Sequence, residues 1–118
     1  MKKGQTIPIK KLYFEADSTN LTSISEPTLN ELYEFLIKND NIDIEVGGHT
    51  NNVPEEEFCD RLSTARAKSV ADYLWNKGIK KERIQFVGYG KRKPIASNKT
   101  PDGRRRNQRV ELKILNVR

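Results

Sequence analysis

Residues 42–78 decide the fold, and they read IDIEVGGHTNNVPEEEFCDRLSTARAKSVADYLWNKG. In the first five residues isoleucine and valine alternate with acidic side chains, which predicts a half-buried strand ending at Gly47-Gly48. The polar turn GHTNNVP then leads into a helix that we expect to run from about Glu55 to Asn76 and to be closed by Gly78. The acidic residues 55–57 stand where the helix dipole favours negative charge, so we interpret them as helix-start charges.

Further elements are predicted on both sides of this stretch. Upstream, residues 7–14 (IPIKKLYF) indicate a first strand, and a helix follows from the start signal Ser25-Glu26-Pro27 to about Asn39. Downstream, strands are predicted around residues 84–88 and 110–114, separated by a long basic connection. The order β-α-β-α-β-loop-β predicts an α/β two-layer sandwich, in which a βαβαββ-type mixed sheet carries the helices on one face.

The composition limits the classes of protein to which the chain can belong. Its 118 residues fit a single domain, 1–118, and no apolar run approaches the roughly 20 residues needed to cross a membrane. The start of the chain lacks the apolar stretch of a signal peptide, so we expect either a cytosolic protein or a domain excised from a larger exported parent. The single cysteine, Cys59, excludes an internal disulfide, and with one histidine it cannot build a usual zinc site. No cofactor is therefore expected.

Charge is distributed unevenly along the chain. Residues 1–60 hold five lysines and twelve acidic residues, whereas residues 61–118 hold seventeen Lys or Arg and four acidic residues. The asymmetry suggests an anionic partner for the second half, or two halves that attract one another. The run Arg104–Arg109 is a possible nucleic-acid patch, but it has no aromatic stacking platform beside it. We interpret most of it as a solvated turn or a short helix, and we expect no nucleic-acid partner.

Arg66 is the residue that stands out in the second helix. It shares one i, i+4 row with Leu62, Val70 and Leu74, so a guanidinium interrupts an apolar stripe. Burying such a charge is costly unless a carboxylate faces it. Two interpretations stay open: a structural ion pair or snorkelling side chain, and a clamp for the carboxylate of a ligand.

The turn after the strand at residues 42–46 is a second candidate site. Loops that follow the carboxyl end of a strand and precede a helix are where ligands usually bind in α/β layers. His49 lies in this turn, but no Ser or Cys nucleophile is identifiable with a base and an orienting third group. We therefore expect no enzyme, and we expect His49 to bond to nearby backbone.

Three ordered runs carry a resemblance to a known family: GHTNN, LSTARAKSVADYL and RIQFVGYGKRKPIASNKTPDGRRRNQRVE. Together they strongly resemble the OmpA-like (OmpA/MotB C-terminal) peptidoglycan-binding domain, over about residues 13–115. The resemblance implies the same βαβαββ-type sandwich. It also implies noncovalent binding of peptidoglycan through the diaminopimelate residue of the stem peptide.

The resemblance also assigns site residues. The binding arginine of the family's LSxxRA segment falls on Arg66, the residue already singled out by its position. The family's Asp in GHTD falls on Asn51, and the first Arg of NRRV falls on Gln108, so two charged positions are neutral here. The full set of ligand-binding residues that it implies is Asp17, Thr50, Asn51, Cys59, Arg66, Gln108 and Arg109.

The resemblance further implies where such a domain acts. We expect a periplasmic location, in an outer-membrane-associated parent protein of a Gram-negative bacterium. There the domain would tether the outer membrane or an envelope complex to the cell wall, and it would meet a membrane only through the rest of the parent. The family's Asn three residues before LS falls on Cys59, which is a third departure. The departures at Asn51, Cys59 and Gln108 keep an alternative open: a structural or interaction module with weakened or lost peptidoglycan binding.

Overall fold

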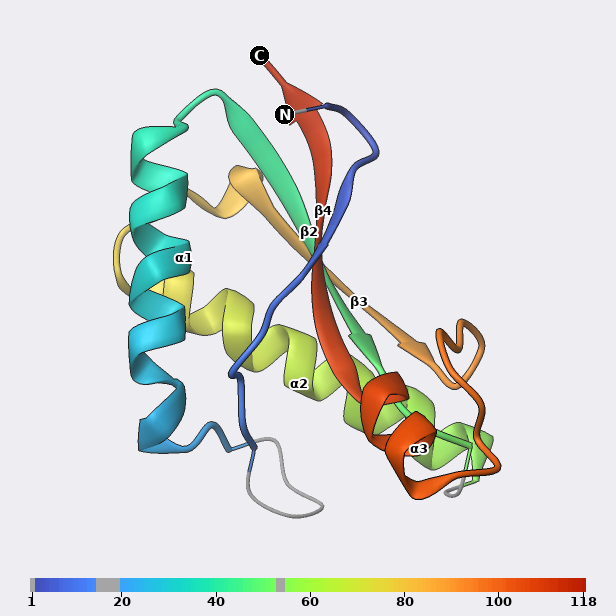
Figure 1. The fold of residues 1–118 in the computed structure, drawn as a ribbon. Coiled ribbons are helices and arrows are strands. Elements are labelled where there is room, and N and C mark those ends of the chain that lie inside the picture. Colours follow the sequence, from blue (N-terminus) through green and yellow to red (C-terminus); the bar gives the residue numbers. More distant parts are fainter. Residues whose placement is uncertain (1, 15–19, 53–54) are drawn as a thin grey trace.

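The computed structural model describes residues 2–14, 20–52 and 55–118 (Figure 1). The elements follow in chain order as β1 (Thr6–Pro8), η1 (Ser23–Ser25), α1 (Glu26–Lys38), β2 (Ile42–His49), α2 (Glu56–Asn76), η2 (Lys81–Arg83), β3 (Ile84–Gly90), α3 (Pro101–Asn107) and β4 (Arg109–Val117). Apart from α3 and the two short 3-10 turns, this is the order that the sequence predicts.

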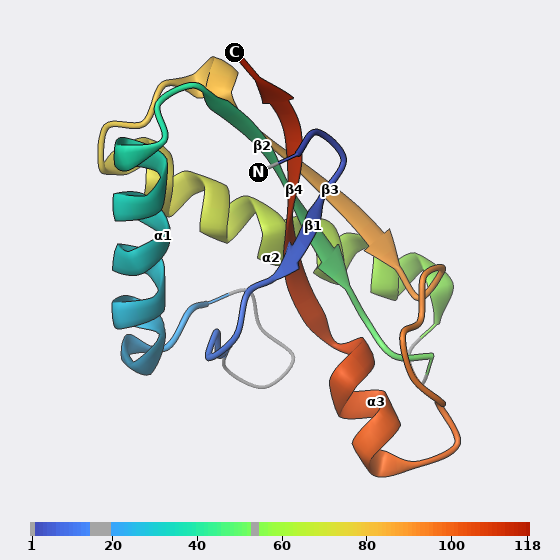
Figure 2. The same cartoon turned by 45° about the horizontal axis from the view of Figure 1, so that its top comes forward.

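The four strands form one mixed sheet in the order β1-β4-β2-β3. β2 and β3 are parallel and joined through α2, whereas β4 pairs antiparallel with both β2 and β1. The long helices α1 and α2 lie on one side of this sheet, as the two ribbon views show (Figures 1 and 2). The predicted α/β two-layer sandwich with a mixed sheet is therefore confirmed.

The hydrophobic core lies between the sheet and the two long helices. Strand β2 shows why: Ile44 and Val46 are fully buried, while Glu45 between them lies on the helix-free face. Burial of one strand face against amphipathic helices supplies the main favourable free energy of folding. The buried side chains of the core cluster are Leu29, Leu36, Ile42, Ile44, Val46, Ala67, Val70, Ala71, Leu74, Ile79, Ile84, Val110, Leu112 and Ile114.

The first strand is shorter than predicted. Residues 7–14 were expected to form one strand, but regular pairing covers only Thr6–Pro8, and Phe14 makes an isolated bridge to Leu21. After Pro8 the Ile9 N–H still donates to the Val110 carbonyl at 3.0 Å, and Lys11, whose φ of 60° lies in the left-handed region, then turns the chain away. The expectation of an eight-residue strand was wrong, because the apolar pattern does not show where pairing ends.

The first long helix begins where the sequence predicts, but for a different local reason. Ser25 precedes Glu26 as expected, yet its hydroxyl does not cap the helix. The Ser25 Oγ donates to the carbonyl of Tyr13 at 2.9 Å and accepts from the Tyr13 N–H at 2.6 Å. Ser25 therefore fastens the segment that follows β1 to the start of α1.

One expectation around the loops needs correction. Gly47 and Gly48 were assigned to a turn, but β2 continues through both of them to His49. Of the two alternatives expected for the basic run, a solvated turn or a short helix, the structure shows the short helix α3, whose start is capped because Thr100 Oγ1 accepts from the Gly103 N–H at 3.0 Å. The second helix is confirmed within one residue of its expected start, and Gly78 follows it with a φ of +112°.

Within the described ranges, no helix is long and apolar enough to cross a membrane.

Candidate functional site

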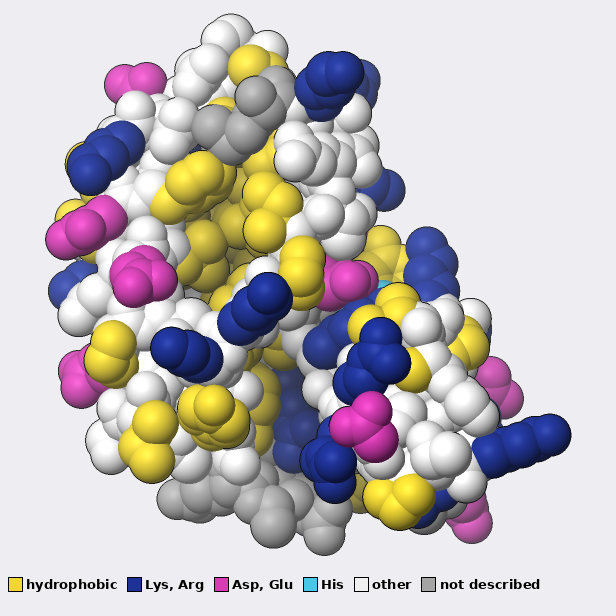
Figure 3. All heavy atoms as spheres, viewed as in Figure 1, with side chains coloured by type: hydrophobic (Ala, Val, Ile, Leu, Met, Phe, Trp, Pro, Cys, Tyr) yellow, Lys and Arg dark blue, Asp and Glu magenta, His cyan; other side chains and the backbone are white. Residues whose placement is uncertain are grey.

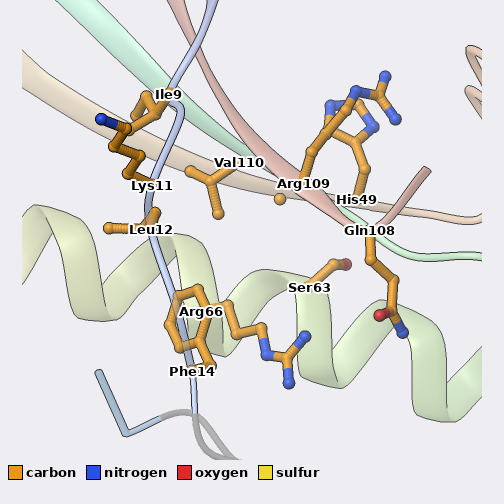
Figure 4. A pocket seen from close by; sticks show the side chains of 11 residues that line it. Ile9, Lys11, Leu12, Phe14, His49, Ser63, Arg66, Gln108, Arg109 and Val110 are labelled. Atoms are coloured by element: carbon orange, nitrogen blue, oxygen red, sulfur yellow. The ribbon is translucent and has the colours of Figure 1, made fainter. Parts of the chain in front are cut away.

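A cavity of about 200 Å³ opens between three parts of the fold (Figure 4). One wall is the segment that leads from β1 to Phe14, the second is α2, and the third is the start of β4. The residues that line it are Ile9, Lys11, Leu12, Phe14, Gly48, His49, Ser63, Arg66, Gln108, Arg109 and Val110. The pocket therefore gathers side chains that are far apart in the sequence.

Arg66 enters this pocket from α2. Its guanidinium carbon lies 4.8 Å from the centre of the Phe14 ring, which is a cation–π distance. Leu62, Val70 and Leu74 of the same row are buried, while Arg66 is half-buried at the edge of the core. The guanidinium of Arg66 and the carboxamide of Gln108 extend toward the same opening (Figure 4). The structure thus brings two predicted site residues together.

The charge of the pocket favours an anionic ligand group. Among the described residues, its lining includes Lys11, Arg66 and Arg109 and no carboxylate, and Arg109 is paired with Glu111 outside the lining. His49 adds no charge at neutral pH, because burial lowers the pKa of its imidazole to about 4. A carboxylate or phosphate would complement such a lining, and a guanidinium can bind a carboxylate with two parallel hydrogen bonds.

Close packing of α2 on the sheet fixes the position of Arg66. A Cβ atom on Gly48 would lie 2.1 Å from the carbonyl oxygen of Ser63, so only glycine allows this approach. Gly88 is equally constrained, because a Cβ there would lie 1.9 Å from Thr64 Oγ1. These contacts hold the first half of α2 against β2 and β3, and Arg66 follows Ser63 by about one helical turn.

His49 and Glu111 are partners in a polar network on the helix-free face of the sheet. His49 Nε2 lies 3.0 Å from Glu111 Oε1, and the imidazole stacks on Tyr89 at 5.0 Å between ring centres. The expectation that His49 bonds to nearby backbone was wrong, because its partner is a side chain on β4. Arg109 and Lys93 add to the effect of burial on the pKa of His49, and Glu111 opposes it.

Arg109 belongs to this network as well as to the pocket lining. Its Nε lies 3.1 Å from Glu111 Oε2, and its Nη atoms donate to the carbonyl oxygens of Asn107 at 3.1 Å and Lys93 at 3.0 Å. In Figure 4 its guanidinium extends to the side of His49 and away from that of Arg66. The protein therefore holds Arg109 in place, and its contact with a ligand stays a prediction.

Thr50, Asn51 and Cys59 lie together just before and within the first turn of α2. Thr50 is 2% exposed, and its Oγ1 donates to the carbonyl oxygen of Asn51 at 2.9 Å. The Cys59 thiol is fully buried and lies 3.7 Å from the same oxygen. None of the three lines the cavity, and Asp17 lies outside the described residues. Their role in ligand binding also stays a prediction.

The described side chains of this pocket do not combine a nucleophile with a base and an orienting group. Ser63 and His49 both line it, but the Ser63 hydroxyl donates to the carbonyl oxygen of Asp60 at 3.2 Å and accepts from the Gly90 N–H at 3.0 Å. No bond joins that hydroxyl to the imidazole among the described contacts. Likewise, no group of three or more His, Cys, Asp or Glu side chains in the described ranges is placed to hold a metal ion.

Asn107 matches the family's NRRV motif but was assigned no role from the sequence, and it organises the loop beside the pocket. Its side chain is fully buried and makes four hydrogen bonds. Oδ1 accepts from the N–H groups of Ile95 at 2.7 Å and Ala96 at 3.0 Å, while Nδ2 donates to Ala96 O at 3.0 Å and Asn98 Oδ1 at 2.8 Å. The signal available was a pair of amide residues, Asn107 and Gln108, between a basic run and a strand, and amide side chains can satisfy donors and acceptors together.

Comparisons with known proteins agree with the fold. The OmpA family model matches residues 13–108. The chain is 39% identical over 106 residues to Outer membrane protein A of Bordetella avium, covering 90% of this chain and 55% of that protein. It is 38% identical over 101 residues to Peptidoglycan-binding protein ArfA of Mycobacterium bovis, covering 86% of this chain and 31% of that protein.

A solved structure of similar architecture is the cell wall anchor of the T6SS from Pseudomonas aeruginosa. The TM-score is 0.81 at 30% identity, covering 94% of this chain and 79% of that chain. The chain spans about half or less of the length of the two curated relatives, so it corresponds to one part of each.

Proposed function

Because this chain belongs to the OmpA family, we propose that it binds peptidoglycan noncovalently through the diaminopimelate residue of the stem peptide. The observation that carries the proposal is the position of Arg66, which lines a pocket together with Lys11 and Gln108. A carboxylate of diaminopimelate would accept charge-assisted hydrogen bonds from the guanidinium. The Gln108 carboxamide, which extends to the same opening, would bond to a neighbouring peptide group.

The ammonium group of diaminopimelate needs an acceptor beside the pocket. The family resemblance assigns this role to Asn51, with Asp17 as a second candidate. The side-chain carbonyl of Asn51 is a neutral acceptor, so it would bind an ammonium less strongly than the carboxylate that the family pattern carries there. Thr50 and Cys59 would help to hold Asn51, since both contact its backbone carbonyl.

The names of related proteins support a role in the cell envelope. One relative is called an outer membrane protein, another a peptidoglycan-binding protein, and a similar structure is that of a cell wall anchor. We place the domain in the periplasm, within a larger outer-membrane-associated parent of a Gram-negative bacterium. Its role there is to tether the outer membrane or an envelope complex to the wall. It is a binding role rather than a catalytic one, and none of these names is that of an enzyme.

Calorimetric titration with two matched stem tripeptides tests the proposal. One carries diaminopimelate at its third position, and the other carries lysine, which lacks the second carboxylate. We expect the lysine peptide to bind about tenfold more weakly or worse, because a charge-assisted hydrogen bond contributes about 1.5 to 3 kcal/mol. Equal affinities would contradict recognition of diaminopimelate. Absence of binding by both would favour the alternative, a structural or interaction module of the same fold.

A further inference from the structure

A strongly basic surface adjoins the pocket. Residues 91–109 hold eight basic residues and a single acidic one, Asp102. Most of the basic side chains are exposed or half-buried on the loop after β3 and on α3. In the space-filling view, Lys and Arg side chains gather over this region, whereas acidic side chains follow α1 on the other side of the molecule (Figure 3). We define the basic surface as Lys91, Lys93, Lys99, Arg104, Arg105 and Arg106.

The protein itself neutralises little of this charge. Arg105 pairs with Asp102 at 3.2 Å, but both side chains are mostly exposed, so the pair contributes little. Among the described residues, no carboxylate lies within ion-pair distance of Lys91, Lys99 or Arg106. The basic surface therefore presents a net positive potential to solvent.

The backbone beneath the basic surface is held in a fixed arrangement. Asn107, fully buried, hydrogen-bonds to Ile95 and Ala96 and so ties the loop to the end of α3. Gly103 lets α3 pack directly on the loop, since a Cβ there would lie 1.8 Å from the carbonyl oxygen of Ser97. The positive charges are thus preorganised and need little ordering when a partner binds.

The basic surface is continuous with the Arg66 pocket. Gln108 and Arg109 follow α3 directly in the chain and line that pocket. A polymer whose side branch enters the pocket must therefore pass close to α3. Residues 91–109 contain no aromatic side chain on which a nucleic-acid base could stack, which disfavours a nucleic acid as the partner.

We propose that the basic surface is a second contact with the wall polymer. It binds the carboxylates of stem peptides that neighbour the one held by Arg66. This inference rests on the proposed function, but it concerns a different surface and a different property. Pocket binding recognises one stem peptide, whereas the basic surface adds affinity only when several anionic stems are joined in one polymer. It also makes wall binding sensitive to salt.

The test compares two triple variants with equal loss of charge. Lys99→Gln, Arg105→Gln and Arg106→Gln together neutralise exposed positions of the basic surface. As the control, Lys3→Gln, Lys38→Gln and Lys80→Gln remove three exposed lysines that lie outside the basic surface. Each variant is sedimented with insoluble peptidoglycan at about 50 mM and about 500 mM salt, which changes the screening length severalfold. Each is also titrated with the soluble diaminopimelate tripeptide.

We expect the basic-surface variant to bind insoluble peptidoglycan about tenfold more weakly than the control at low salt, and nearly equally at high salt. Its affinity for the soluble tripeptide should match that of wild type. Equal sedimentation of the two variants at low salt would overturn the inference, and so would a parallel loss of tripeptide binding. Stronger wild-type binding to phosphatidylglycerol vesicles or to single-stranded DNA than to the wall would also overturn it. If wild type does not bind the tripeptide but still sediments with peptidoglycan as expected, the proposed function is contradicted. A salt-sensitive wall contact that depends on α3 is then retained.

Discussion

The guanidinium carbon of Arg66 lies 4.8 Å from the centre of the Phe14 ring, so an aromatic side chain packs directly against the proposed ligand-binding arginine. Phe14 is half-buried and belongs to the segment that Ser25 fastens to the start of α1 through Tyr13. The contact joins two parts of the chain that are 52 positions apart in sequence. It directs the guanidinium toward the pocket before any ligand arrives.

Replacing Phe14 should therefore weaken ligand binding. Phe14→Leu keeps apolar volume but removes the ring, and cation–π contacts of this kind contribute about 0.5 to 1 kcal/mol. We expect a loss of about two- to fivefold in affinity for the diaminopimelate tripeptide, measured by calorimetry. An affinity equal to that of wild type would show that the ring does not orient Arg66.

Asn51→Asp should strengthen binding of the same peptide. An added carboxylate opposite the ligand ammonium favours the complex by about 1 kcal/mol in a partly dry site. The new charge precedes α2 closely enough for the helix dipole to tolerate it, so folding should not suffer. Titrations at two salt concentrations provide the measurement. Unchanged or weaker affinity would mean that position 51 does not contact the ammonium.

His49 should make the domain less stable as the pH falls. Its pKa is about 4 in the folded protein and about 6.5 when unfolded, so between these values the unfolded state binds the proton and the folded state does not. Stability is unaffected above the unfolded value and decreases as the pH falls below it. From pH 7 to pH 5, wild type should lose about 2 kcal/mol more than His49→Gln.

Urea unfolding of both proteins at the two pH values checks this prediction. The groups that face the imidazole are Arg109, Lys93, Glu111 and Tyr89. Tyr89 stays neutral throughout, because its hydrogen bond to Glu45 raises its pKa to about 12. Parallel losses in wild type and His49→Gln would show that the buried imidazole titrates near its ordinary value.

Gly48→Ala should destabilise the domain by about 3 kcal/mol, because the new methyl group would collide with the backbone of α2 at Ser63. Gly78→Ala is the matched control. No atom lies within 4 Å of a Cβ at Gly78, so only its left-handed φ opposes the change, at a cost of about 1 kcal/mol. The measurement is the free energy of unfolding in urea. Similar values for both variants would contradict close packing of α2 on β2.

Local periodicity was enough to predict the main elements of this fold. The alternation at residues 42–46 and the helical spacing of Leu62, Val70 and Leu74 both reflect burial on one face, and burial is what the structure shows. Arg66 could be singled out for the same reason, as the charged member of an apolar row. These patterns indicate whether each side chain is buried or exposed within its own helix or strand.

Contacts between elements could not be predicted in this way. The pair of His49 and Glu111 joins strands 62 positions apart in the sequence, and no local pattern indicates their register. The position of Gly48 against Ser63 depends on how α2 packs on the sheet. Helix α3, in contrast, was one of the two expected alternatives, and a local signal indicates its start, since Thr100 followed by Pro101 is a typical helix start.

Sedimentation of Arg66→Ala with purified peptidoglycan tests the central proposal most directly. Arg61→Ala is the control, because Arg61 lies on the same helix, is exposed and pairs only with the exposed Glu57 among the described residues. We expect Arg66→Ala to lose at least 90% of the wild-type affinity, since each charge-assisted hydrogen bond contributes about 1.5 to 3 kcal/mol. Arg61→Ala should sediment like wild type, and both variants should keep the native circular dichroism spectrum. If folded Arg66→Ala sediments as well as wild type, Arg66 does not hold the ligand and the proposed function is contradicted.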